Sequence, residues 1–94
     1  MSRHVKLTDG TTYPVDRCGA DEERLRIRVT APGFDMLEAV QKFGDPANTE
    51  TIEHYFDGTE TDHVYFTGYT DLESLLSENA GMVVTLRRAA GNSQ

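Results

Sequence analysis

Lysine and arginine are absent from residues 43 to 86, which make up nearly half of this 94-residue chain. The same stretch carries nine carboxylates: Asp45, Glu50, Glu53, Asp57, Glu60, Asp62, Asp71, Glu73 and Glu78. The first 42 residues balance seven basic against seven acidic side chains, so the net charge of −7 comes from the second half. Such a surface repels phosphate backbones and attracts basic protein surfaces, so we expect no direct binding of nucleic acid.

Cysteine and long apolar runs are scarce as well. Cys18 is the only cysteine, which excludes an intramolecular disulfide and a metal site built from several thiolates. No apolar run exceeds the three residues of 82–84, so we expect neither a signal peptide nor a membrane span. The length predicts one domain over residues 1–88, followed by a frayed tail at 89–94 that has nothing to bury.

The N-terminal residues predict a β-hairpin. Apolar and polar residues alternate up to Asp9-Gly10, a dipeptide typical of a two-residue type I′ turn. The returning strand at 11–15 contains Pro14, which cannot donate to a sheet ladder. We therefore expect this strand to lie at a sheet edge or to bulge at Pro14, and we expect a polar loop containing Gly19 to follow.

The clearest strand is predicted over 23–29, where apolar and polar side chains alternate throughout. The apolar side chains would face a core, and the other face would present Arg24, Arg26 and Arg28 about 7 Å apart. This basic strip has two interpretations, a solvated outer face or an anion-binding strip. Acidic residues at 21–23 and in the second half favour the solvated face.

One helix is predicted over about 35–43. Asp35 is the expected N-cap, with Glu38 as the reciprocal partner of a capping box. Gly44 and Pro46 would end the helix. The apolar stripe expected to pack on the sheet consists of Met36, Leu37, Val40 and Phe43.

Two further strands, 51–56 and 63–67, would form a hairpin around an acidic loop. The register that pairs Phe56 with Val64 separates an apolar face from a polar one. On the polar, exposed face it places Tyr55 opposite Tyr65.

Residues 70–78 fit either a strand or a short helix, and a last strand at about 82–88 follows in both cases. The fold class is therefore α+β: a small strand-rich domain, with a mostly antiparallel sheet and one helix packed on it.

No pattern for catalysis, a cofactor or a metal stands out. His54 and His63 would point to opposite faces of their hairpin, which separates the ligands of an imidazole–carboxylate site. The loop 57–62 lacks the spacing of a calcium-binding loop, and no positioned base accompanies Cys18. We expect a protein that is not an enzyme, with no catalytic residue, cofactor or metal.

Several surface residues are candidates for contact with a protein partner. Tyrosine supplies a large contact area at low entropic cost, and carboxylates complement a basic partner. The candidates are Asp57, Glu60, Asp62, Tyr55, Tyr65, Asp71 and Glu73. An alternative role for the two tyrosines is only to stabilise their hairpin.

Four short motifs follow one another along residues 34–88. They are a helix that ends at Phe43, the segment 45–49, the strand motif at 52–55, and a Gly-Tyr-Thr-x-Leu element at 68–72. This pattern resembles small uncharacterised proteins that are encoded in bacteriophages and prophages, often near tail genes. The resemblance implies a phage context, favours a strand over a helix in the terminal part, and implies no enzymatic activity.

These observations predict a non-enzymatic, acidic protein–protein interaction module of phage origin, a small structural or assembly protein of the tail region. The alternative is a phage-encoded, anti-CRISPR-like inhibitor of a host defence nuclease, whose acidic surface imitates a nucleic acid. The expected partner is a phage structural protein or, for the alternative, a basic nucleic-acid-binding protein of the host. The exposed sheet face and the sheet edges would mediate self-association or docking, and the protein would act in the host cytoplasm or in the virion rather than in a membrane.

Overall fold

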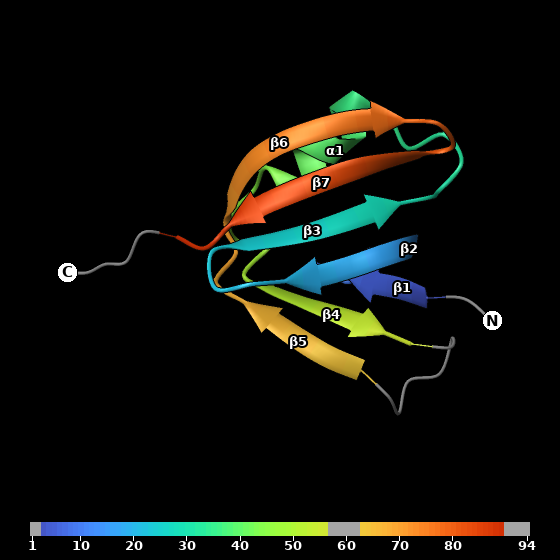
Figure 1. Ribbon diagram of the computed structural model, residues 1–94. Helices are drawn as coiled ribbons and strands as arrows, with labels where there is room; N and C mark the ends of the chain where they lie inside the picture. The colour runs from blue at the N-terminus through green and yellow to red at the C-terminus, as the bar shows by residue number, and fades with distance from the viewer. Residues whose placement is uncertain (1–2, 57–62, 90–94) are drawn as a thin grey trace.

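The computed structural model describes residues 3–56 and 63–89. They form one antiparallel sheet and one helix, which confirms the expected strand-rich α+β fold (Figure 1). The elements are β1 (Arg3–Lys6), β2 (Thr12–Ala20), β3 (Arg24–Val29), α1 (Met36–Phe43), β4 (Thr51–Tyr55), β5 (His63–Thr67), β6 (Asp71–Glu78) and β7 (Gly81–Arg87). Of the two alternatives for residues 70–78, the strand is therefore correct. The predicted fraying of the tail concerns residues that lie almost entirely outside the described ranges.

The sheet is strongly curled. Its strand order is β5-β4-β1-β2-β3-β7-β6, so β5 and β6 lie at opposite edges although only residues 68–70 connect them. Seven flat strands would separate the edges by about 29 Å, whereas the chain from Thr67 to Asp71 reaches about 14 Å at most. The edges must therefore approach each other at this end, and in Figure 1 they converge on the left and diverge on the right.

The inner face of the curled sheet holds the core, and α1 packs over the part of it formed by β6 and β7. The core combines side chains from most of the strands with one helical phenylalanine. Its buried members are Val5, Leu7, Tyr13, Val15, Leu25, Ile27, Val29, Phe43, Ile52, Tyr69, Val84 and Leu86. The three apolar side chains of β3 are among them, as predicted from the alternation over 23–29.

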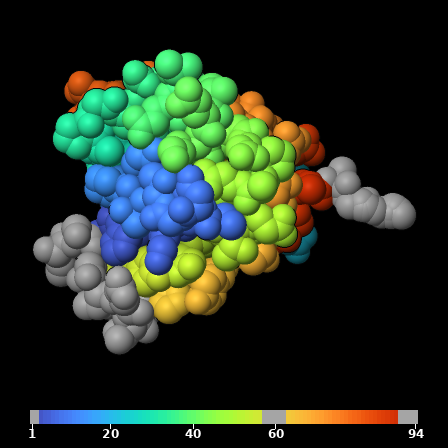
Figure 2. All heavy atoms as spheres, turned by 180° about the vertical axis from the view of Figure 1, so that it is seen from behind, coloured from blue at the N-terminus to red at the C-terminus, as the bar shows by residue number. Residues whose placement is uncertain are grey.

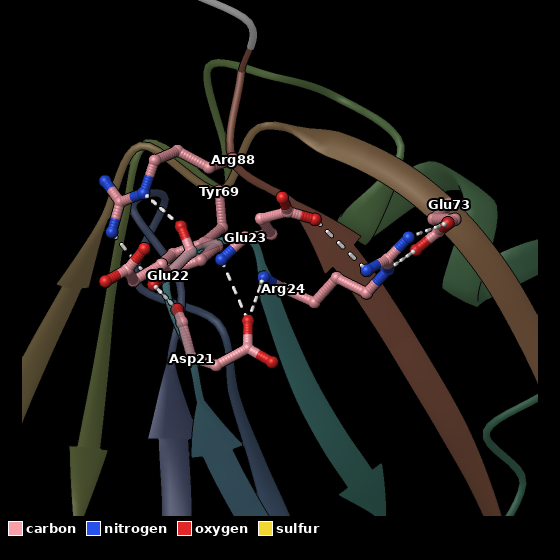
Figure 3. Close-up of polar contacts among 7 residues, drawn as sticks. All are labelled: Asp21, Glu22, Glu23, Arg24, Tyr69, Glu73 and Arg88. Carbon is pink, nitrogen blue, oxygen red and sulfur yellow. Dashed lines mark hydrogen bonds and ion pairs between the residues drawn. The ribbon is translucent and has the colours of Figure 1, made fainter.

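A polar clasp holds the end of the sheet where the edges converge (Figure 3). The guanidinium group of Arg88 donates to the carbonyl of Glu22 at 3.0 Å, to that of Thr67 at 3.3 Å, and to Oη of Tyr69 at 2.9 Å. Tyr69 Oη in turn donates to the carbonyl of Asp21 at 2.7 Å. The clasp thus joins the β2–β3 turn, the end of β5 and the residue that follows β7.

The first hairpin forms as predicted, but its turn differs. Gly10 has a φ of +93°, whereas Asp9 is not in the positive region, so the predicted type I′ turn, which needs both, is wrong. The N–H of Gly10 donates to the carbonyl of Leu7 at 2.9 Å, and the N–H of Leu7 donates to that of Thr11 at 2.8 Å. The loop therefore has three residues and ends in a left-handed glycine, the usual alternative to type I′.

β2 is not an edge strand, since β1 and β3 flank it. It also continues to Ala20, through the segment predicted as a polar loop. The ladder bulges between Val15 and Arg17, next to Pro14 rather than at it. The pairing of β2 with β3 begins at Val15 and Val29. Pro14 lies outside these pairs, so the N–H that proline lacks removes no hydrogen bond from the β2–β3 ladder.

The hairpin of β4 and β5 has a register two residues away from the predicted one. Tyr55 pairs with His63, and Tyr65 pairs with Glu53, so the predicted pair of tyrosines is wrong. A shift by two residues keeps every side chain on its face. The predicted faces are therefore correct, and His54 and His63 do lie on opposite sides.

Gly68→Ala should destabilise the protein. Gly68 has a φ of +87°, and a Cβ at this position would lie 3.3 Å from Nη1 of Arg88. We expect the free energy of unfolding, measured in urea, to fall by about 1–3 kcal/mol, because other residues are strained in this conformation. Gly19→Ala is the matched control: Gly19 has open space around its Cβ position, so the change should stay within about 0.5 kcal/mol. Equal effects of the two substitutions would contradict the strained turn.

Candidate interaction surfaces

Two side-chain hydrogen bonds set the rotation of α1 about its own axis. Asp35 caps the helix as predicted, since its Oδ1 accepts the N–H of Glu38 at 2.9 Å. The Glu38 carboxylate accepts from Tyr13 Oη at 2.6 Å rather than completing the capping box. One turn later, Lys42 Nζ donates to Asp9 Oδ2 at 3.0 Å. Both bonds fasten one side of the helix to the β1–β2 hairpin.

This rotation buries Ala39 and Phe43 and turns the other apolar side chains of α1 outward. Met36, Leu37 and Val40 are 46%, 67% and 49% exposed. The prediction that these three pack on the sheet is therefore wrong, and only Phe43 of the predicted stripe is buried. We call Met36, Leu37 and Val40 the helix patch. Figure 2 shows α1, in green, at the surface near the top of the molecule.

The two tyrosines nominated for partner contact have different environments. Tyr55 is 7% exposed and stacks between the rings of His4 and His63, with 4.8 Å between centroids on each side. Tyr65 is 59% exposed and lies on the edge strand β5. Only Tyr65 is therefore accessible to a partner, and the prediction of an exposed tyrosine pair is wrong.

Acids from β6 neutralise part of the basic strip on β3. Nε and Nη2 of Arg24 donate to both carboxylate oxygens of Glu73 at 2.7 and 3.2 Å (Figure 3). Arg28 forms ion pairs with Glu78 at 3.1 Å and with Asp16. The hydrogen bond from Arg24 holds the pKa of Glu73 below its ordinary value. Such exposed pairs add little stability, but they neutralise two of the nine carboxylates of the second half.

Of the other acidic residues predicted to contact a partner, the structure describes Asp71. Asp71 is exposed and lies opposite Arg87 in the β6–β7 ladder. Asp57, Glu60 and Asp62 lie outside the described residues. The third member of the basic strip, Arg26, is exposed on the outer face of β3, and no carboxylate within residues 3–56 and 63–89 forms an ion pair with it.

Among the groups that could act as a nucleophile or base, Cys18 is half-buried and His54 is buried. Burial raises the pKa of the Cys18 thiol to about 12 and lowers the pKa of the His54 imidazole, so both groups are neutral near pH 7. Residues 3–56 and 63–89 contain no group of three or more His, Cys, Asp or Glu side chains that could hold a metal ion. The acidic loop considered for calcium, 57–62, falls outside these ranges.

The Cys18 thiol should be unreactive in the folded protein. At pH 8 we expect alkylation by iodoacetamide, followed by mass spectrometry, to be at least about a hundredfold slower than for free cysteine, because the thiolate is the reactive form. In denaturing urea the same thiol should react at the rate of free cysteine. A folded-state rate close to that of free cysteine would contradict the raised pKa.

Comparisons with known proteins leave the chain without an established relative. No family model, no curated protein and no solved structure matches it. The resemblance to phage proteins near tail genes therefore stays a prediction. No helix in the described part of the chain is long and apolar enough to cross a membrane.

Proposed function

We propose that this chain is a non-enzymatic protein–protein interaction module whose partner covers the outer side of α1. The observation that supports this most is the helix patch, where three neighbouring apolar side chains are about half exposed or more. Met36 and Val40 are four residues apart and Leu37 lies beside them, so they share one helical face. Burying one such side chain completely contributes about 1.5–3 kcal/mol, which suits the centre of a binding site.

The edge strand β5 offers a second means of docking. Its residues 63–67 include no Lys, Asp, Glu or Pro, which are common protectors of an exposed edge. An extended segment of a partner, or of a second copy of this chain, could add to this edge through backbone hydrogen bonds. The exposed side chains of Val64 and Tyr65 would then contribute apolar contact.

The phage context is the finer part of the proposal and depends on the motif resemblance. We propose a small structural or assembly protein of the tail region, with a phage structural protein as partner. A structural role requires that the protein be present in purified virions from a producing strain, where mass spectrometry would detect it. Presence in the producing cells but absence from the virions would contradict that role.

The alternative, an acidic inhibitor that imitates nucleic acid, receives less support. Glu73 and Glu78 form ion pairs with Arg24 and Arg28. Fewer unpaired carboxylates are therefore available to bind a basic channel. A pull-down from host lysate separates the two proposals. Capture of a nuclease at low but not at high salt favours the mimic, because charge-dependent binding is screened by salt.

Leu37→Glu should weaken partner capture without unfolding the protein. Because Leu37 is 67% exposed, the substitution should change the free energy of unfolding by less than about 0.5 kcal/mol. A charge in the middle of an apolar contact should nevertheless weaken partner binding about tenfold or more. The measurement compares the proteins retained from phage-producing cells by tagged wild-type and variant protein.

Gln41→Glu is the matched control, since it adds the same charge at an exposed position of the same helix. We expect it to retain the partner that Leu37→Glu loses. If both variants retain the same proteins as the wild type, the helix patch is not the binding surface.

A further inference from the structure

A hollow of about 510 Å³ lies beside the second half of β2. In the described part of the chain, the pairing of β1 with β2 runs up to Arg3 and Val15, whereas β2 continues to Ala20. Beyond Arg3, the described residues place no strand against that side of β2. The hollow is lined by Arg3, Arg17, Cys18, Gly19, Ala20, Asp21, Arg24 and Arg26.

Among the described residues, three of the four arginines in this lining lack an acceptor. Arg24, the fourth, is bound to Glu73, and outside the hollow Arg28 and Arg88 have acceptors as well. Within residues 3–56 and 63–89, the side chains of Arg3, Arg17 and Arg26 form no hydrogen bond and no ion pair. We call these three side chains the free arginines of the hollow.

Two of the free arginines lie near another arginine on the outer face of the sheet. Arg17 is directly opposite Arg28 in the β2–β3 ladder, and Arg26 lies two residues before Arg28 on the same face of β3. Like charges at such positions repel each other, so a bound anion would relieve the repulsion. This concentration of positive charge is unexpected in a chain with a net charge of −7.

The acid in the lining offsets only part of the positive charge, since it is one carboxylate beside four arginines. Oδ1 of Asp21 accepts the backbone N–H groups of Glu23 and Arg24, each at 2.8 Å. These bonds hold the carboxylate on the β2–β3 turn (Figure 3). The acidic residues on more distant parts of the surface are screened beyond about 8–10 Å at physiological salt. The local charge of the hollow therefore stays positive.

We propose that this hollow binds a phosphate group. Guanidinium groups present several N–H donors in a rigid fork that matches the oxygens of phosphate. The lining of the hollow carries more positive than negative side chains. A long nucleic acid does not suit the site, because the rest of the surface repels it. The site is independent of the helix patch, so its failure in a test would leave the interaction proposal unaffected.

The test is an NMR titration of the intact protein with inorganic phosphate and, separately, with adenosine monophosphate, at ionic strength held constant with sodium chloride. We expect saturable shifts of the backbone amides of Gly19 and Ala20 with both probes. Tighter binding of the free ion points to inorganic phosphate as the ligand, and tighter binding of the nucleotide points to a phosphate ester; both results support the site.

The double variant Arg17→Gln/Arg26→Gln should weaken phosphate binding about tenfold or more, because charge-assisted hydrogen bonds are roughly twice as strong as neutral ones. Arg87→Gln is the matched control: Arg87 is exposed, lies outside the hollow and carries the same charge. It should bind phosphate as the wild type does. Saturable binding that Arg87→Gln weakens as much as the double variant, or no saturable binding at all, would overturn the proposal.

Discussion

The connection between β5 and β6 is the constraint on which the rest of the structure depends. Three residues join the two edges of a seven-stranded sheet, so the sheet must curl until the edges approach each other at that end. Gly68 makes the turn with a positive φ, and Tyr69 fills the core behind it. Arg88 then ties this connection to the β2–β3 turn. The curled inner face is what gives such a short chain a single core.

Curling of the sheet also bears on the helix patch. The inner face needs a cover, and α1 supplies it with Ala39 and Phe43 while Glu38 and Lys42 fasten the same side to the β1–β2 hairpin. The helix packs with this side only, so the helix patch faces solvent. The arginine-lined hollow lies beside the second half of β2, where the described residues place no further strand.

Local patterns predicted most of the elements, but contacts between distant residues decided the surfaces. The alternation over 23–29 and the Asp35 cap are local signals, and both are confirmed. The rotation of α1 was predicted wrongly because it depends on a bond to Tyr13, which is 25 residues away. Arg24 and Glu73 are 49 residues apart in the chain and lie on strands separated by β7. Composition alone could not show this ion pair and therefore overestimated the free acidic charge. The exposed helix patch had no sequence signal, since an apolar stripe usually indicates a core face.

The central claim is that the clasp of Tyr69 and Arg88 ties the β5–β6 connection to the β2–β3 turn, and a double-mutant cycle tests it most directly. Tyr69→Phe, Arg88→Gln and the double variant would be compared by their free energies of unfolding. We predict that the two single effects add up to more than the double effect, with a coupling of about 0.5–3 kcal/mol, as for residues in one hydrogen-bonded network. Additive effects, with a coupling indistinguishable from zero, would contradict the account.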